Sequence, residues 1–288
     1  MQKEKDEIQK WEICNGEALI TIAKTTNLVK KAMKIHSLSA TTTAVLGRSL
    51  TMSALMGTKL SHKDANITSI IEGDGPAGKI TCVAKTGCIV KGYMQHPEVD
   101  LFPNSQGKLD VSGAVGKTGK LRVVMDLGFG SPYTGEVNLV SGEIAEDFTS
   151  YYATSLQQPC AIALGVLVSN KKECICASGM LIELFPDASE NTINVIEEKI
   201  KSINDFSKQL STQTLDDFVT KLFEDAVKQE YSVEPKYSCK CSKQKLIRVL
   251  KRMAQNSSID DLYNEDGKIE AHCDFCNKYM YITKEDLK

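Results

Sequence analysis

The chain has 288 residues, of which 42% are hydrophobic and 25% are charged, and its formal net charge is −2. This length predicts two or three folding units, and the small net charge argues against binding to nucleic acid or anionic membranes through overall charge. No apolar run approaches the roughly 18 residues that span a bilayer, and the N-terminus, MQKEKDEIQK, lacks the apolar core of a signal peptide. We therefore expect a cytoplasmic protein, in which thiols are normally reduced.

Residues 1–186 are expected to form an N-terminal domain that mixes short strands with Gly-rich turns. Strands outweigh helices there, so the fold class predicted is α+β with a mostly antiparallel sheet. The strands expected from β-branched runs are 18–23 and 161–168, and the helices are 26–35 and 41–56. Glycines between residues 73 and 142 predict tight hairpins.

Residues 187–234 change in composition and are expected to form a helical linker. They contain no Gly, Pro or Cys, and they carry 11 acidic and five basic residues. Two apolar stripes recur at helical spacing: Ile193, Ile196, Ile200 and Ile203, then Leu215, Phe218, Leu222 and Ala226. Thr214 and Asp217 resemble a capping box before the second stripe. Such helices are unstable alone in water, so we expect the stripes to pack on the first domain.

Residues 235–288 are expected to form a small C-terminal zinc-binding α+β domain. The segment contains C-K-C, then 31 residues, then C-D-F-C. Between the two pairs we expect a short helix with Leu246, Val249, Leu250 and Met253 on one face. Residues 269–272 and 278–282 are expected to form a hairpin closed by the second cysteine pair.

The two cysteine pairs predict one zinc ion held by Cys239, Cys241, Cys273 and Cys276. Each pair acts as a short chelate, and four thiolates suit the tetrahedral geometry of zinc. About 54 residues bury little core, so metal binding should supply most of the folding free energy of this segment. His272 is an alternative ligand, but we expect it to face away along its strand.

The one-residue gap in C-K-C is unusual, because structural zinc sites generally space paired ligands by two to four residues. Cys239 and Cys241 are close enough in sequence to be oxidised to each other, and thiolates are the reactive form of cysteine. Oxidation would destroy the ligands, so the fold that zinc supports would be lost. We expect Lys236, Lys240, Lys243 and Lys245 to favour the thiolates.

At this point the sequence resembles the redox-regulated 33-kDa heat-shock chaperone family. The spacing of the four cysteines carries the resemblance, together with motifs spread along the chain. These motifs are ATTTAVLGR at 40–48, GDGP at 73–76, GKLD at 107–110, GAVGK at 113–117, PYTG at 132–135, SGEIAED at 141–147, EDGK at 265–268 and CDFCN at 273–277. Leu156 is a departure, because relatives usually have Glu in a Ser-Glu-Gln motif at that position.

The resemblance implies an ATP-independent holdase chaperone rather than an enzyme. Its reduced form binds one zinc per chain and is inactive. Oxidation forms the disulfides Cys239–Cys241 and Cys273–Cys276, releases zinc and unfolds the linker. The exposed surface then binds unfolding client proteins under oxidative stress, and the active form is a homodimer. No nucleic-acid or membrane partner is expected.

Two other functions compete with this interpretation. A zinc-ribbon protein that binds nucleic acid would use the basic helix face formed by Lys243, Lys245, Arg248, Lys251 and Arg252. A thiol oxidoreductase would need a C-x-x-C that opens a helix after a strand, whereas Cys273 and Cys276 are expected in a hairpin.

The remaining cysteines are expected to be core residues. Cys174 and Cys176 should share one strand face by alternation, and Cys14, Cys82, Cys88 and Cys160 should be inert. The segment 113–118, GAVGKT, lacks the first Gly of a phosphate-binding loop because residue 111 is Val, so we expect a hairpin turn there. His36, His62 and His96 form no catalytic or metal-binding pattern.

Overall fold

The computed structural model describes residues 5–256 and 258–287. The strands are β1 (Glu7–Ile13), β2 (Ala18–Lys24), β3 (Asn66–Gly73), β4 (Ile80–Lys85), β5 (Ile89–Met94), β6 (Gly119–Asp126), β7 (Tyr133–Asn138), β8 (Cys160–Val168), β9 (Cys174–Leu184), β10 (Val227–Val233), β11 (Lys236–Tyr237), β12 (Lys268–Cys273) and β13 (Lys278–Thr283). The α-helices are α1 (Thr26–His36), α2 (Ala40–Gly57), α3 (Val111–Val115), α4 (Ala145–Thr154), α5 (Glu190–Lys201), α6 (Phe206–Leu210), α7 (Leu215–Leu222) and α8 (Lys243–Asn256), and short 3₁₀ turns are η1 (Asp260–Leu262) and η2 (Glu285–Leu287).

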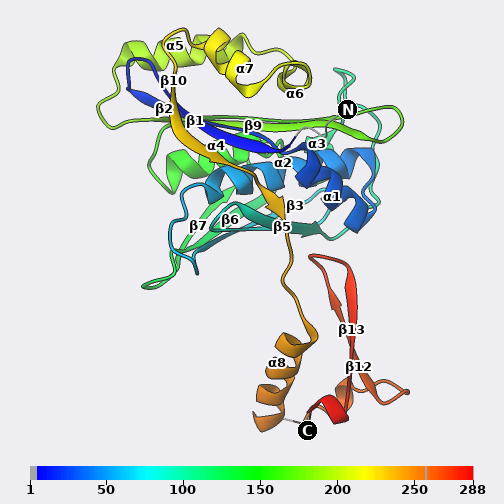
Figure 1. Ribbon diagram of the computed structural model, residues 1–288. Coiled ribbons are helices and arrows are strands. Elements are labelled where there is room, and N and C mark those ends of the chain that lie inside the picture. Colours follow the sequence, from blue (N-terminus) through cyan, green and yellow to red (C-terminus); the bar gives the residue numbers. More distant parts are fainter. Residues whose placement is uncertain (1–4, 257, 288) are drawn as a thin grey trace. The chain divides into compact units, whose positions relative to one another are not determined.

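The chain forms two compact units, Met1–Tyr237 and Ser238–Lys288. The first unit contains a five-stranded sheet in the order β10-β1-β2-β9-β8 and a six-stranded sheet in the order β11-β5-β4-β3-β6-β7. In Figure 1, α5, α6 and α7 cover one face of the five-stranded sheet, and α1, α2 and α4 lie between the two sheets. Within the described residues all strand pairings are antiparallel except that of β5 with β11, so the α+β fold class is confirmed.

Helix α2 forms the centre of the first unit and contacts β8 and β9 of one sheet and β4 and β5 of the other. Sixteen of its residues are buried, and a helix that is buried on every side has no polar face to expose. Its hydroxyls instead donate to carbonyls one turn earlier, as Ser49 does to Val45 and Thr51 does to Gly47. The N-terminus is closed by a reciprocal capping box between Ser39 and Thr42.

The expected elements 18–23, 26–35, 41–56 and 161–168 are all present, each within a residue or two of the expected bounds. The glycine-rich region forms the antiparallel pairs β3–β4, β4–β5 and β6–β7, as the turn signals predicted. The hairpin turn expected at 113–118 is not found. The short helix α3 occupies residues 113–115 of it, because the Asp110 side chain caps the Gly113 N–H at 2.8 Å.

The linker predicted for residues 187–234 contains α5, α6, α7 and the strand β10, so it is not purely helical. Its apolar stripes pack on the five-stranded sheet, as expected. Ile196 and Phe218 are 4% exposed, but Ile193 is 39% exposed and does not join the stripe. Half of the predicted capping box is present, because Thr214 Oγ1 accepts the Asp217 N–H at 3.0 Å. The Asp217 carboxylate accepts the Thr214 hydroxyl at 2.7 Å instead of the Thr214 N–H.

The second unit contains α8 and the β12–β13 hairpin, both predicted from the sequence. Its hydrophobic cluster has three buried members among the described residues, Leu250, Ile269 and Ile282. By contact, Lys236 and Tyr237 belong to the first unit. The boundaries predicted at 186/187 and 234/235 remain predictions. None of the described helices is both long and apolar enough to cross a membrane.

Candidate metal centre

The four paired cysteines meet in the second unit although the pairs are far apart in sequence. Cys239 and Cys241 lie in the irregular segment before α8, Cys273 ends β12, and Cys276 lies in the turn before β13. All four sulfur atoms lie within 4.8 Å of one another. The Sγ–Sγ distance is 3.7 Å between Cys239 and Cys273 and 3.3 Å between Cys241 and Cys276. A cluster of this kind can hold a metal ion.

Local backbone geometry positions each pair. In the hairpin, Cys273 pairs with Lys278, and the Cys273 carbonyl accepts the N–H groups of Cys276 and Asn277 at 3.2 and 2.8 Å. Asn277 adopts a left-handed conformation with φ 58°, which Asn tolerates better than most residues. The tight turn therefore carries both cysteines toward one point. At the other pair, the Ser242 hydroxyl caps the Lys245 N–H at 3.3 Å, so α8 begins at Lys243, two residues after Cys241.

Backbone N–H groups also favour negative charge on two of the sulfurs. Burial opposes ionisation of Cys239, but hydrogen bonds from the Cys241 N–H and from the neighbouring thiols lower its pKa. The Lys278 N–H likewise donates to Cys276, but burial, the largest cause, and hydrogen bonds with Cys241 and Cys273 raise the pKa of that thiol. Burial is the largest cause that raises the pKa of Cys273, and the hydrogen bond to Cys239 adds to it. A thiolate at Cys239 and three neighbouring thiols form a set of four sulfur donors. Such a set suits a thiophilic cation.

His272 lies beside the cluster but does not belong to it. Its Nε2 lies 2.6 Å from Asn277 Oδ1, its Nδ1 lies 3.3 Å from Asp274, and its ring packs against Tyr279. The alternative ligand considered from the sequence therefore has other partners.

The lysines expected to favour the thiolates are mostly engaged elsewhere. Lys243 forms an ion pair with Asp286 at 2.7 Å, and Lys245 Nζ donates to the Lys240 carbonyl at 2.8 Å. Lys236 pairs with Glu234 in the first unit. Backbone N–H groups, rather than lysine charges, are thus the donors that the structure places on these sulfurs.

The other cysteines have a different chemistry. Burial is the largest cause that raises the pKa to about 11 for Cys14 and Cys88, and to about 12 for Cys82, Cys160 and Cys174. Thiols with such pKa values are poor nucleophiles at neutral pH. Cys174 and Cys176 are both buried, as predicted, but they belong to different hydrophobic clusters. The single strand face predicted for them is wrong because a register shift separates Cys176 from Cys174, and it interrupts the alternation.

A docking face on the first unit holds the linker helices. We define the docking face as the side of the five-stranded sheet formed by Trp11, Ile20, Ile22, Met180 and Ile182, which share a cluster with Ile196, Phe206, Leu210, Leu215 and Phe218 of the linker. Polar contacts fasten its margins. Glu17, in the β1–β2 turn, accepts hydrogen bonds from Ser189 N at 2.8 Å, Ser189 Oγ at 2.7 Å and Thr192 Oγ1 at 2.6 Å.

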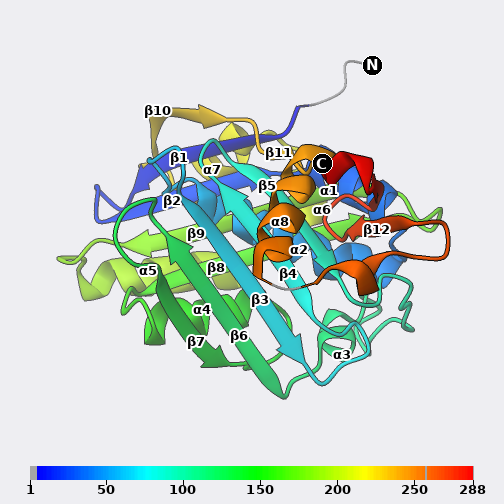
Figure 2. The same ribbon diagram turned by 90° about the horizontal axis from the view of Figure 1, so that it is seen from below.

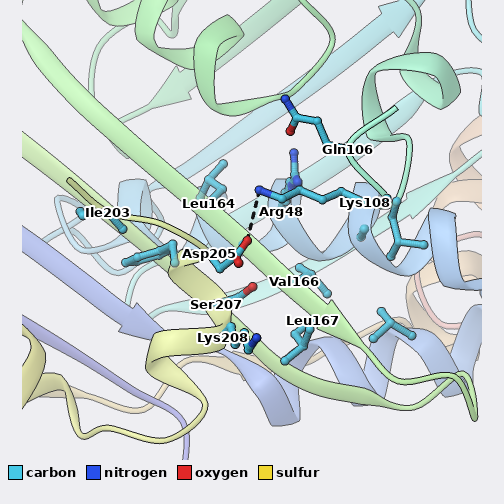
Figure 3. A pocket seen from close by; sticks show the side chains of 16 residues that line it. Arg48, Gln106, Lys108, Leu164, Val166, Leu167, Ile203, Asp205, Ser207 and Lys208 are labelled. Atoms are coloured by element: carbon cyan, nitrogen blue, oxygen red, sulfur yellow. Dashed lines mark ion pairs between the residues drawn. The ribbon is translucent and has the colours of Figure 1, made fainter. Parts of the chain in front are cut away.

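A cavity of about 560 Å³ lies at another margin, where α6 meets α2, β8 and the loop before α3. Figure 3 shows its lining, in which Lys108 of the loop reaches Asp205 at the start of α6, at 3.2 Å. The lining of the cavity therefore includes an ion pair between the loop before α3 and the predicted linker.

Sequence reasoning missed the residues that fasten the end of the linker. Tyr237 is 3% exposed; its hydroxyl lies 2.8 Å from the Gly92 carbonyl and 2.9 Å from His36 Nε2, and its carbonyl accepts from Lys31 at 2.9 Å. The strand β10 was also missed. The sequence contained a signal for this strand. Val227, Tyr231 and Val233 are separated by four and two residues, so they share one face of a strand, in a segment that was predicted to be helical.

Comparisons with known proteins agree with this architecture. The family model described as "Hsp33 protein" matches residues 6–283. The chain is 44% identical over 267 residues to the 33 kDa chaperonin of Acetivibrio thermocellus, covering 92% of this chain and 90% of that one. It is 38% identical over 285 residues to a 33 kDa chaperonin of Clostridium botulinum, covering 98% of this chain and 96% of that one.

A solved structure gives the same result. The crystal structure of the 33 kDa chaperonin, a heat shock protein 33 homolog from Thermotoga maritima, superposes with a TM-score of 0.88 at 32% identity and covers 99% of this chain and 97% of that one. Leu156, the departure noted in the sequence, packs against the main hydrophobic cluster. With the family model spanning nearly the whole chain, the protein belongs to the Hsp33 family of chaperones.

Proposed function

We propose that this protein is an ATP-independent holdase controlled by one zinc ion that Cys239, Cys241, Cys273 and Cys276 bind in the reduced form. The observation that carries the proposal is the meeting of four sulfurs within 4.8 Å in a unit whose hydrophobic cluster has three buried members among the described residues. Four sulfur ligands suit zinc, and so small a core needs metal binding to fold. The same ligands are then both a structural support and a redox sensor.

In the proposed switch, the thiolates are oxidised in two local pairs, Cys239 with Cys241 and Cys273 with Cys276. Each pair gives two electrons and forms one S–S bond. One hydrogen peroxide accepts these electrons with two protons, its O–O bond breaks, and it leaves as two waters. Sulfurs joined in disulfides are no longer thiolate ligands, so zinc is released and the second unit loses its support.

Loss of the second unit is proposed to loosen residues 187–234 and to uncover the docking face. That face is a contiguous apolar surface, of the kind that binds partners. Unfolding proteins expose apolar segments, so we propose that they are the clients. We further propose that the oxidised form is a homodimer, that the protein acts in the cytoplasm without catalysis, and that it binds neither nucleic acid nor membranes.

An aggregation assay tests this function. Oxidised protein, prepared with peroxide, should suppress aggregation of a heat-unfolded client without nucleotide, whereas the reduced, zinc-loaded protein should not. Zinc content and free thiols are measured on the same samples. Equal suppression by both forms, or a requirement for ATP, would contradict the proposal. Salt-dependent binding of RNA or DNA would instead favour the nucleic-acid function considered for the basic face of α8.

A further inference from the structure

The outer edge of the five-stranded sheet is closed by a strand that comes from the linker. Figure 2 shows β10 as the outermost strand beside β1. On its other side β1 pairs with β2 through all seven residues, so β1 becomes the edge of the sheet if β10 leaves. A free edge presents a row of unpaired N–H and C=O groups.

The side chains of β10 contribute little burial to this pairing. None of its seven residues is buried, and Val227 is 62% exposed. Two side-chain contacts to β1 are polar: Gln229 donates to Glu12 at 2.5 Å in a half-buried contact, and Ser232 donates to Glu7 at 2.9 Å at the surface. Only Tyr231 and Val233 pack partly against the main cluster. Main-chain hydrogen bonds therefore contribute more to the pairing of β10 with β1 than side-chain contacts do.

The register of the pairing is irregular, and one of its side-chain contacts depends on a linker helix. The register shifts between Gln9 and Trp11, so the strand does not pair continuously. Beyond the shift, Lys228 stands opposite Trp11, and directly paired residues point to the same side of a sheet. Trp11 belongs to the docking face, so β10 places a lysine beside an apolar surface, with its Nζ 5.4 Å from the indole ring. The same ammonium lies 2.8 Å from Asp216 of α7, so an apolar side chain suits that position once the linker helices have left.

From these contacts we propose that the outer edge of β1 is a binding site for an extended segment of unfolded polypeptide, and that β10 is its internal stand-in. The inference rests on the proposed holdase function. A client adds a strand to β1 through main-chain hydrogen bonds, which do not depend on its sequence, and places apolar residues at alternate positions over the docking face. Release of the linker uncovers the edge and the face together.

Photocrosslinking in the full-length protein tests the site. A photoreactive p-benzoylphenylalanine replaces Glu12, which faces Val227 across the pairing. In the reduced protein the probe should crosslink within the chain, to β10. In the oxidised protein with an unfolding client, the intrachain product should be lost and a client product gained. A probe at exposed Asn138 on β7, the edge of the other sheet, should give no client product.

Competition by peptides tests the mode of binding. A peptide with the sequence of residues 227–233 should reduce the client product at position 12, and the same peptide with Lys228→Leu should do so at lower concentration. A version N-methylated at alternate residues, which cannot donate to the edge, should not compete. Equal competition by the N-methylated peptide would overturn the strand-addition mode.

Two results would overturn the inference while leaving the holdase function intact. One is full suppression of aggregation by the oxidised probe variant with no client product at position 12. The other is a product with a second copy of the chain in place of the client. Absence of suppression by unmodified oxidised protein would instead refute the proposed function itself.

Discussion

The ten cysteines divide into two groups by what surrounds each sulfur. The clustered four lie among one another and receive backbone N–H groups at Cys239 and Cys276. Buried thiols such as Cys82 and Cys88 lie in the core of the first unit, where burial raises the pKa. Spacing alone predicted this division, because paired cysteines make short chelates and scattered ones do not.

Replacing one clustered cysteine should remove the metal. We expect Cys273→Ser to lose stoichiometric zinc in the reduced protein, because three sulfurs leave the tetrahedral set incomplete. Cys88→Ser is the matched control and should keep one zinc per chain, since Cys88 lies in the core of the first unit. The zinc content per chain is measured by metal analysis of both purified proteins. Stoichiometric zinc in a protein with all four clustered cysteines changed to Ser would contradict the assignment.

Asp6 gives the first unit a pH dependence of unusual sign. It caps α1 by accepting the Asn27 and Leu28 N–H groups at 2.8 and 2.7 Å, yet burial, the largest cause, raises its pKa to about 6. A raised pKa means that its contribution to stability is complete below about pH 4 and is lost as pH rises through about 6.

The predicted loss is on the order of 2 kcal/mol. The Asp6→Asn variant has no carboxylate at this position and should not show this loss of stability. The stability of the wild type relative to the variant should therefore fall between pH 4 and pH 7. Denaturant unfolding followed by Trp11 emission, at both pH values, makes the comparison. A stability difference that does not change with pH would contradict the prediction.

At the scale of elements, the linker is held by an apolar face and by a few polar contacts at its margins. Glu17 is the most concentrated of these contacts, since one carboxylate oxygen accepts from Ser189 N, Ser189 Oγ and Thr192 Oγ1. It thereby fixes the start of α5, whose N-cap is Ser189. Carboxylates are favourable at that end of a helix.

We expect Glu17→Ala to loosen the linker without affecting zinc. Hydrogen exchange in α5 should become faster in the reduced protein, and less oxidant should be needed to produce holdase activity. Glu17→Gln keeps an acceptor and should show a smaller effect. Glu72→Ala, which removes an exposed ion pair with Lys79, serves as control. Unchanged exchange in α5 of the Glu17→Ala variant would rule out this role.

How far the sequence predicted these elements depends on the range of the interactions involved. Local signals were sufficient for the Thr214 cap and for the hairpin around Cys273 and Cys276. They were insufficient for β10, because an edge strand is fixed by a partner more than 200 residues away in sequence. The Glu17 contacts have the same origin, since the turn and its donors are 172 or more residues apart. The register shift near Cys176 depends on pairing with β8, which alternation alone does not reveal.

At the scale of the whole molecule, Trp11 reports on linker release, because it is the only tryptophan and lies under the linker helices. Oxidation should shift its emission to longer wavelength as water reaches the ring. Linker amides should lose protection from exchange, while amides of β8 keep theirs, since β8 pairs with β9 and contacts α2. Measured on one sample, both changes should accompany zinc loss. Unchanged linker protection after zinc loss and the appearance of holdase activity would show that the switch does not work through the linker.

The five-stranded sheet joins the beginning of the chain to a strand that comes near its end. A ribosome delivers β1 early, whereas β10 and the helices over the docking face follow only after strands β1 to β9 have been made. Domains fold as they emerge, so the growing chain passes through a stage in which the β1 edge and the docking face are open. The nascent protein therefore resembles the activated form proposed above until the last third of translation covers the edge and the face.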